Sequence, residues 1–127
     1  MQEKFLFEYA VIRVMPRVER EEFFNVGIIL FCAKKKFLQS IFYLDKNKIN
    51  AFSKEIDIDE LTANLTAFER ISNGLDGSGP IGKYDQPSRF RWLTATRSTV
   101  LQCSKVHPGF CIDPNETMLK LHDELVL

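Results

Sequence analysis

The sequence predicts an α+β domain, a mainly antiparallel sheet of about four strands packed against about three helices. Strand patterns fill the first third of the chain and return once near residue 100, with helical patterns between and after them. The 127 residues are 45% hydrophobic and 27% charged, which is typical of a folded domain with a core of its own. We therefore treat residues 1–127 as a single domain.

The first predicted strand covers residues 5–15. Aromatic and β-branched residues dominate this stretch, and Pro16 ends it. The charged residues that follow, up to residue 24, predict a solvated connection.

The clearest predicted element is a strand over residues 25–33, which carries no charge. Alternation places Val26 and Ile28 on one face and Ile29 on the other, so we expect a strand that is covered on both sides. Gly27 marks a bulge or a close approach. Residues 37–44 resume the strand pattern after three lysines, which predicts an antiparallel hairpin.

Two helices are predicted next. Asp45 caps a short one, and Asp57 or Asp59 begins a longer one with apolar residues at spacings of three and four. Asn73-Gly74 ends the longer helix, and the glycine-rich segment up to residue 87 is a predicted loop.

The last third is less regular. Residues 88–95 fit either a helix or a strand, residues 99–104 a strand, and residues 105–112 a turn-rich connection around Pro108-Gly109. Asp113 opens the last helix, which we expect to bury three apolar side chains: Met118, Leu121 and Leu125.

Charge and cysteine content exclude several classes. Seventeen basic and seventeen acidic residues cancel, so no net field steers the chain toward nucleic acid or a membrane. The longest uncharged apolar run, residues 26–33, is too short to cross a bilayer, and the N-terminus lacks a signal-peptide cleavage pattern. Three cysteines make a disulfide framework improbable, so we expect a cytoplasmic protein without a membrane anchor.

Two motifs are rejected on context. Residues 77–83 have the spacing of a nucleotide-binding loop, but a helix precedes them and Pro80 removes an amide donor. Four potential zinc ligands, Cys103, His107, Cys111 and His122, lack the spacing of a known finger or knuckle. We therefore expect no metal and no cofactor.

Three further signals each have a plain structural alternative. A Cys–His nucleophilic pair would use Cys103 or Cys111 with His107, although a strand cysteine usually behaves as a small apolar residue. The basic and aromatic stretch at residues 89–92 is of the kind that stacks on single-stranded nucleic acid, but its aromatic residues suit a core equally well. Arg13 interrupts an apolar strand and needs an anion, a paired carboxylate or water.

Four segments together resemble one bacterial family: YAVIR (9–13), EFFNVGIILF (22–31), RWLTATRS (91–98) and VHPG (106–109). The family is catalogued as domain of unknown function 3037. The resemblance spans most of the chain, and it implies a protein partner, because members are associated with genes for kinases of the HipA toxin type. The polar family-like positions, which we expect to converge at one end of the sheet, are Arg13, Glu22, Asn25, Arg97, Ser98 and His107.

Three functions remain open. The first is a regulatory or interaction module that binds a protein partner, a HipA-like kinase in particular, and it fits the lack of a convincing catalytic set. The second is a small enzyme or anion-binding domain whose site gathers Arg13, Glu22, Arg97 and His107. The third is a single-stranded nucleic-acid binder. The sequence favours a non-enzyme and leaves self-association open.

Overall fold

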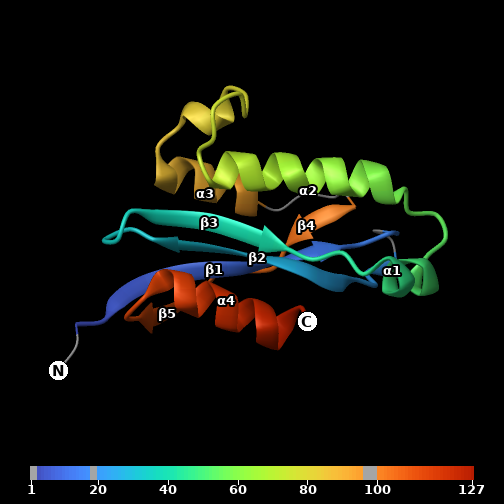
Figure 1. The fold of residues 1–127 in the computed structure, drawn as a ribbon, viewed down its shortest axis with the longest axis horizontal. Coiled ribbons are helices and arrows are strands. Elements are labelled where there is room, and N and C mark those ends of the chain that lie inside the picture. Colours follow the sequence, from blue (N-terminus) through green and yellow to red (C-terminus); the bar gives the residue numbers. More distant parts are fainter. Residues whose placement is uncertain (1–2, 18–19, 96–99) are drawn as a thin grey trace.

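The sheet is the centre of the structure, a computed structural model that describes residues 3–17, 20–95 and 100–127 (Figure 1). It has five strands, and every pairing between them is antiparallel. The strands are β1 (Phe5–Val14), β2 (Phe24–Cys32), β3 (Phe37–Phe42), β4 (Leu101–Cys103) and β5 (His107–Cys111). Their order is β3-β2-β1-β4. β4 pairs with the last residues of β1 and β5 with its first residues, along the same edge, so β1 and β2 are the inner strands.

Each α-helix of the described residues begins at an aspartate whose carboxylate accepts one or two hydrogen bonds from backbone N–H groups of the first turn. The caps are Asp45, Asp57, Asp85 and Asp113. The helices that they start are α1 (Lys46–Phe52), α2 (Ile58–Ser72), α3 (Gln86–Thr94) and α4 (Pro114–Leu125). The prediction of an α+β fold is confirmed, and the stretch that fitted either a helix or a strand proves to be helical up to Thr94.

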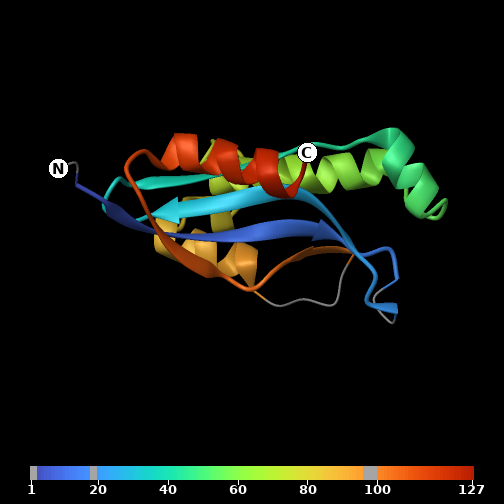
Figure 2. The ribbon, with the colours of Figure 1, turned by 90° about the horizontal axis from the view of Figure 1, so that it is seen from below.

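Helices cover the two faces of the sheet unequally. On one, here called the α2 face, α2 and α3 cover a core that includes Ile12, Ile29 and Phe90. On the other, the α4 face, α4 packs over β2 and β3 (Figures 1 and 2), and Met118 and Ile28 belong to the core on this side. Figure 2 shows β1 and the edge formed by β4 and β5 beside α4, not beneath it.

A bulge interrupts the pairing of β1 with β2. Ile12 is opposite Gly27 but Arg13 is opposite Asn25, so Val26 is an extra residue. Val26 therefore packs in the α2-face core, whereas Ile28 packs on the α4 face, and the predicted common face for these two residues was wrong. The prediction of a bulge or close approach at Gly27 is confirmed, because a Cβ there would lie 2.4 Å from the Ile41 carbonyl oxygen.

The connection predicted at residues 105–112 is wrong, because most of it forms β5. Pro108 is tolerated on this edge strand, where not every backbone group pairs within the sheet. Gly109 is required because a Cβ would come within 2.6 Å of the Phe7 ring.

Ser104 joins β4 to β5 along the same edge of β1. Its N–H donates to the Val11 carbonyl oxygen at 2.8 Å, and its Oγ accepts the Val11 N–H at 2.8 Å. The side chain thus takes the place of a backbone acceptor, which keeps β1 paired across the junction.

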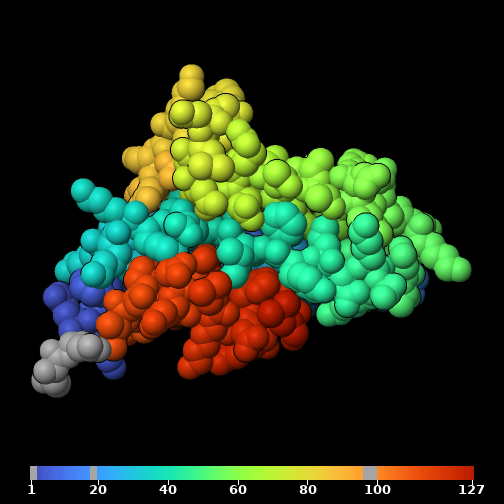
Figure 3. Space-filling view, in the orientation of Figure 1, coloured from blue at the N-terminus to red at the C-terminus, as the bar shows by residue number. Residues whose placement is uncertain are grey.

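Two smaller differences concern the buried residues of α4 and an additional short helix in the predicted glycine-rich loop. Leu125 is 38% exposed, and His122 takes a buried position on α4 in its stead. In the glycine-rich segment a short 3-10 helix, η2 (Ile81–Lys83), precedes α3, and Figure 3 shows this segment (yellow) projecting beyond the helical layer. In the described part of the chain no helix has the length and apolarity to cross a membrane.

Candidate functional site

Two of the predicted polar residues, Arg13 and Asn25, lie side by side on the α4 face. They are direct cross-strand partners on β1 and β2. The Asn25 amide nitrogen donates to the Leu125 carbonyl oxygen of α4 at 3.0 Å, which identifies the face. The bulge produces this arrangement: unbroken alternation back from Ile28 would turn Asn25 to the α2 face.

The Arg13 guanidinium lies over the Phe23 ring, 4.0 Å from the ring centroid. Its Nε atom is buried and has no hydrogen-bond partner among the residues that the structure describes, and the same is true of Asn25 Oδ1. The pair therefore combines one buried donor with one buried acceptor.

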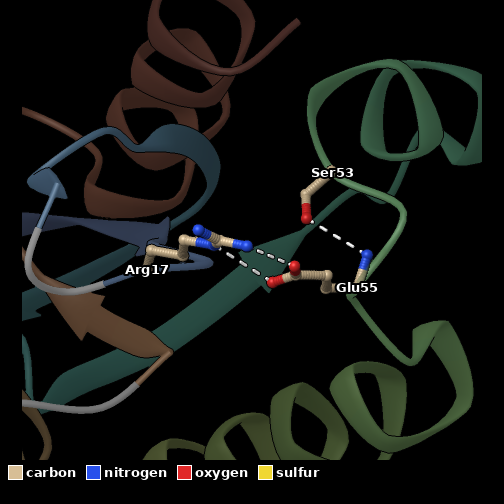
Figure 4. Close-up of polar contacts among 3 residues, drawn as sticks. All are labelled: Arg17, Ser53 and Glu55. Carbon is tan, nitrogen blue, oxygen red and sulfur yellow. Dashed lines mark hydrogen bonds and ion pairs between the residues drawn. The ribbon is translucent and has the colours of Figure 1, made fainter.

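Glu22 is placed differently. Its carboxylate pairs with Arg20 at 3.0 Å, and it lines a shallow hollow with Arg17 beyond the end of β1. Arg17 donates from its guanidinium to the Glu55 carboxylate (Figure 4). The backbone N–H of Glu55 in turn donates to Ser53 Oγ at 3.2 Å. This contact ties the β1–β2 connection to the α1–α2 loop.

His107 shares the α4 face with Arg13 but not its surroundings. It is opposite Tyr9, and the two rings are 5.4 Å apart. Tyr9 precedes Arg13 by four residues, roughly 13 Å along a strand. Arg97 and Ser98 lie outside the described residues.

An apolar surface, which the sequence did not predict, lies at the outer end of β5. Leu6 and Phe110 are cross-strand partners, 54% and 69% exposed, and Ile112 is 48% exposed. We call these three residues the Phe110 surface. Figure 3 shows the start of β1 (blue), the β2–β3 turn (cyan) and the entry to α4 (orange) gathered at this end of the molecule.

Two hollows of about 340 and 300 Å³ meet at this surface, since Lys4 and Phe110 line both. Leu6, Glu8 and Lys34 line the larger, and Ile112 lines the smaller. The missed signal was the alternation of Phe110 and Ile112 with smaller residues, which Pro108-Gly109 obscured.

Comparison with protein families gives a match that covers nearly the whole chain. The model of the family described as Protein of unknown function (DUF3037) matches residues 9–126. The chain belongs to the DUF3037 family. No similar chain was found among curated proteins or among solved structures.

The Cys–His pair that the sequence allowed is not formed by Cys103 in this DUF3037 domain. Cys103 lies on the α2 face and its Sγ donates to the Leu93 carbonyl oxygen at 3.5 Å, whereas His107 lies on the α4 face. Burial, followed by the nearby Cys32 thiol, raises the pKa of Cys111, so a thiolate is disfavoured there. These thiols behave as core groups.

The aromatic and basic stretch of the DUF3037 domain forms α3. Phe90 is 1% exposed and packs against Phe31, with ring centroids 5.4 Å apart. It is therefore not available to stack on a base, which leaves Trp92, 41% exposed, as the aromatic residue of this stretch at the surface.

Proposed function

We propose that this DUF3037 domain is a regulatory protein-interaction module, that it binds its partner through the Phe110 surface, and that the partner is a HipA-like kinase. The observation that supports the proposal is the 69% exposure of Phe110 beside Leu6 and Ile112. Adjoining exposed apolar side chains at the edge of a folded domain mark contact surfaces, and large aromatic residues contribute most to binding energy there.

The two hollows fit the role of Phe110 as an anchor. A partner side chain in either hollow would contact the Phe110 ring, since the residue lines both. Lys4 and Lys34 add positive charge at the rim of the larger hollow, and Glu8 is the carboxylate there. We therefore expect the partner to present apolar side chains next to acidic ones.

Binding by side chains is favoured over strand addition at this edge. Pro108 has no N–H to offer an added strand, and β5 has only five residues. The three cysteines are free in the structure, and we place the module in the cytoplasm, where thiols stay reduced.

The test is a binding measurement with the kinase encoded in the same operon. Calorimetry at micromolar concentration is expected to show a complex, and Phe110→Ser should weaken it by about 30-fold or more, as for an aromatic anchor worth about 2 kcal/mol. Leu119→Ser is the matched control, because Leu119 is 51% exposed on α4 outside the Phe110 surface.

Two results would contradict the proposal. One is the absence of a complex between clean, folded preparations at micromolar concentration. The other is a complex that Phe110→Ser and Leu119→Ser weaken equally. Size-exclusion chromatography of the domain alone is the companion measurement, because a dimer that Phe110→Ser dissociates would assign the surface to self-association.

A further inference from the structure

A hollow of about 160 Å³ lies beside the first two turns of α2. It is lined by Pro16, which follows the end of β1, whereas Leu6 of the Phe110 surface lies near the start of the same strand. The hollow and the Phe110 surface therefore lie at opposite ends of β1 and share no residue. At roughly 30 Å³ for each water-sized group, the hollow has room for about five of them.

One part of the lining is apolar. Leu61 is 3% exposed and holds α2 against the core, and Ile56 and Leu101 pack against the same core. Pro16 and Val100 complete this part of the lining, and Val100 is 43% exposed. Because a carbon chain that enters would displace water from these side chains, the hollow favours a ligand with methylene groups.

Three carboxylates also line the hollow, and among the described residues no basic side chain lines it. Glu55 is paired with Arg17 (Figure 4). Asp57 caps α2 and accepts two backbone N–H groups of its first turn. The Glu60 carboxylate has neither an ion pair nor a hydrogen bond within the part of the chain that the structure describes. Glu60 therefore supplies the negative charge that a cationic ligand can use.

Asn64 adds a second polar group beside Glu60. The two residues are four apart on α2, so they lie on the same side of the helix with their Cβ atoms roughly 6 Å from each other. Both are exposed, whereas Leu61 between them is buried in the core and belongs to the apolar lining. The Asn64 amide oxygen is thus an acceptor next to the Glu60 carboxylate, at the edge of the apolar part.

The charges select a cation, and the lining selects an organic one. An anion at the N-terminus of α2 would meet three carboxylates, and two of the N–H groups there are already bonded to Asp57. A metal ion needs several ligands, and within the described residues no group of three acidic, histidine or cysteine side chains is placed to hold one. An ammonium group carries one positive charge and three N–H donors, which suit the Glu60 carboxylate and the Asn64 oxygen.

We propose that this hollow binds an alkylammonium group, with the nitrogen at Glu60 and Asn64 and the methylene groups along the apolar lining. A lysine side chain has four carbons and one nitrogen beyond Cα, which is about the number of groups that the hollow can take. A free aliphatic amine has the same chemistry. Because the Phe110 surface is at the other end of β1, either proposal can fail without the other.

The test is an NMR titration of the isotope-labelled domain at constant ionic strength. The reporters are the backbone N–H groups of Glu60 and Leu61 and the side-chain amide of Asn64, and the probes are butylammonium, butanol and ammonium chloride. Butylammonium is expected to shift these signals saturably, with a dissociation constant on the order of 1 mM. It should bind at least about fivefold more tightly than butanol, which lacks the charge, and than ammonium, which lacks the chain.

Two further probes identify the natural source of the group. If Nα-acetyl-lysine amide binds at least as tightly as butylammonium, the source is a lysine side chain of a partner protein. If the lysine derivative does not bind but the diamine putrescine does, the source is a free amine.

A matched pair of variants separates recognition from general charge. Glu60→Gln should weaken butylammonium about fivefold and leave butanol unchanged, because it removes the charge and keeps the size. Asp59→Asn is the control, since Asp59 lies in the same first turn of α2 but does not line the hollow. Both substitutions remove one carboxylate from the same helix end, so they should change helix stability alike, and only Glu60→Gln should change binding.

Three outcomes would overturn the proposal. The first is a wild-type titration in which butylammonium does not shift the reporter signals saturably, and this result does not depend on whether a variant folds. The second is binding of butanol or ammonium as tight as that of butylammonium. The third is an equal loss of affinity in Asp59→Asn and Glu60→Gln.

Discussion

Gly27→Ala tests the close approach of β3 to β2 at the residue that follows the bulge. The new Cβ would lie 2.4 Å from the Ile41 carbonyl oxygen, 3.1 Å from Phe42 Cβ and 3.2 Å from Ile12 Cδ1. Carbon and oxygen without a normal hydrogen bond stay about 3.3 Å apart, so β3 has to move by roughly 0.9 Å relative to β2.

The expected cost is about 2 kcal/mol. Overpacking a core costs about 1–3 kcal/mol, and a rigid backbone atom in the way places this case toward the upper end. Replacing glycine also reduces the entropy of the unfolded chain, which returns about 0.5 kcal/mol. For a chain of this size the net loss corresponds to a fall in Tm of about 8 °C.

Urea unfolding followed by circular dichroism measures this loss as a lower midpoint at unchanged slope. Gln39→Ala, at an exposed position of β3, is the control and should stay within about 0.5 kcal/mol of the wild type. If Gly27→Ala is as stable as the control, β3 does not approach β2 as closely as described.

Three further perturbations probe other parts of the fold. Ser104→Ala leaves the buried Val11 N–H without its acceptor, so we expect a loss of about 1–3 kcal/mol in urea unfolding and faster hydrogen exchange at Val11; protection equal to wild type would contradict this. Burial lowers the pKa of His122 despite the opposing effect of Asp123, so protonation favours the unfolded chain: stability is complete above the unfolded pKa of about 6.5 and is lost as pH falls through the folded pKa. His122→Leu should flatten unfolding free energy against pH in this window, and an unchanged slope would assign the effect to other groups. Leu65→Ala, at a fully buried site on α2, should cost about 2–5 kcal/mol, and a loss below 1 kcal/mol would mean that the α2-face core is looser than the structure shows.

Local chemistry made most of the fold predictable. The four aspartate caps reflect hydrogen bonds within a few residues of the chain, and three of these caps could be anticipated without tertiary information. The uncharged run that became β2 was equally plain, because a strand covered on both faces leaves no polar positions.

The errors have tertiary causes. Val26 was assigned to the wrong face because a bulge is a property of two paired strands, and one strand read alone shows only regular alternation. β5 was missed because Pro108-Gly109 is typical of a turn, whereas here the space taken by the Phe7 ring calls for the glycine. Leu125 was expected in the core, but His122 occupies the inner position.

The candidate site was predictable only in part. Arg13 and Asn25 were singled out individually, but their adjacency depends on strand register, which no periodicity within one strand supplies. Glu22 fitted the same expectation, yet its charged neighbour Arg20 is closer in sequence and takes its carboxylate.

The contact between Asn25 and α4 has a consequence for the order of folding. The hydrogen bond to Leu125 closes a separation of 100 residues, so it forms only after nearly the whole chain is available. Until α4 docks, the Ile28 and Leu30 side chains of β2 lack their cover, and a growing chain exposes them to aggregation. The Arg13–Asn25 pair therefore has its final surroundings only in a fully folded domain, once α4 is in place.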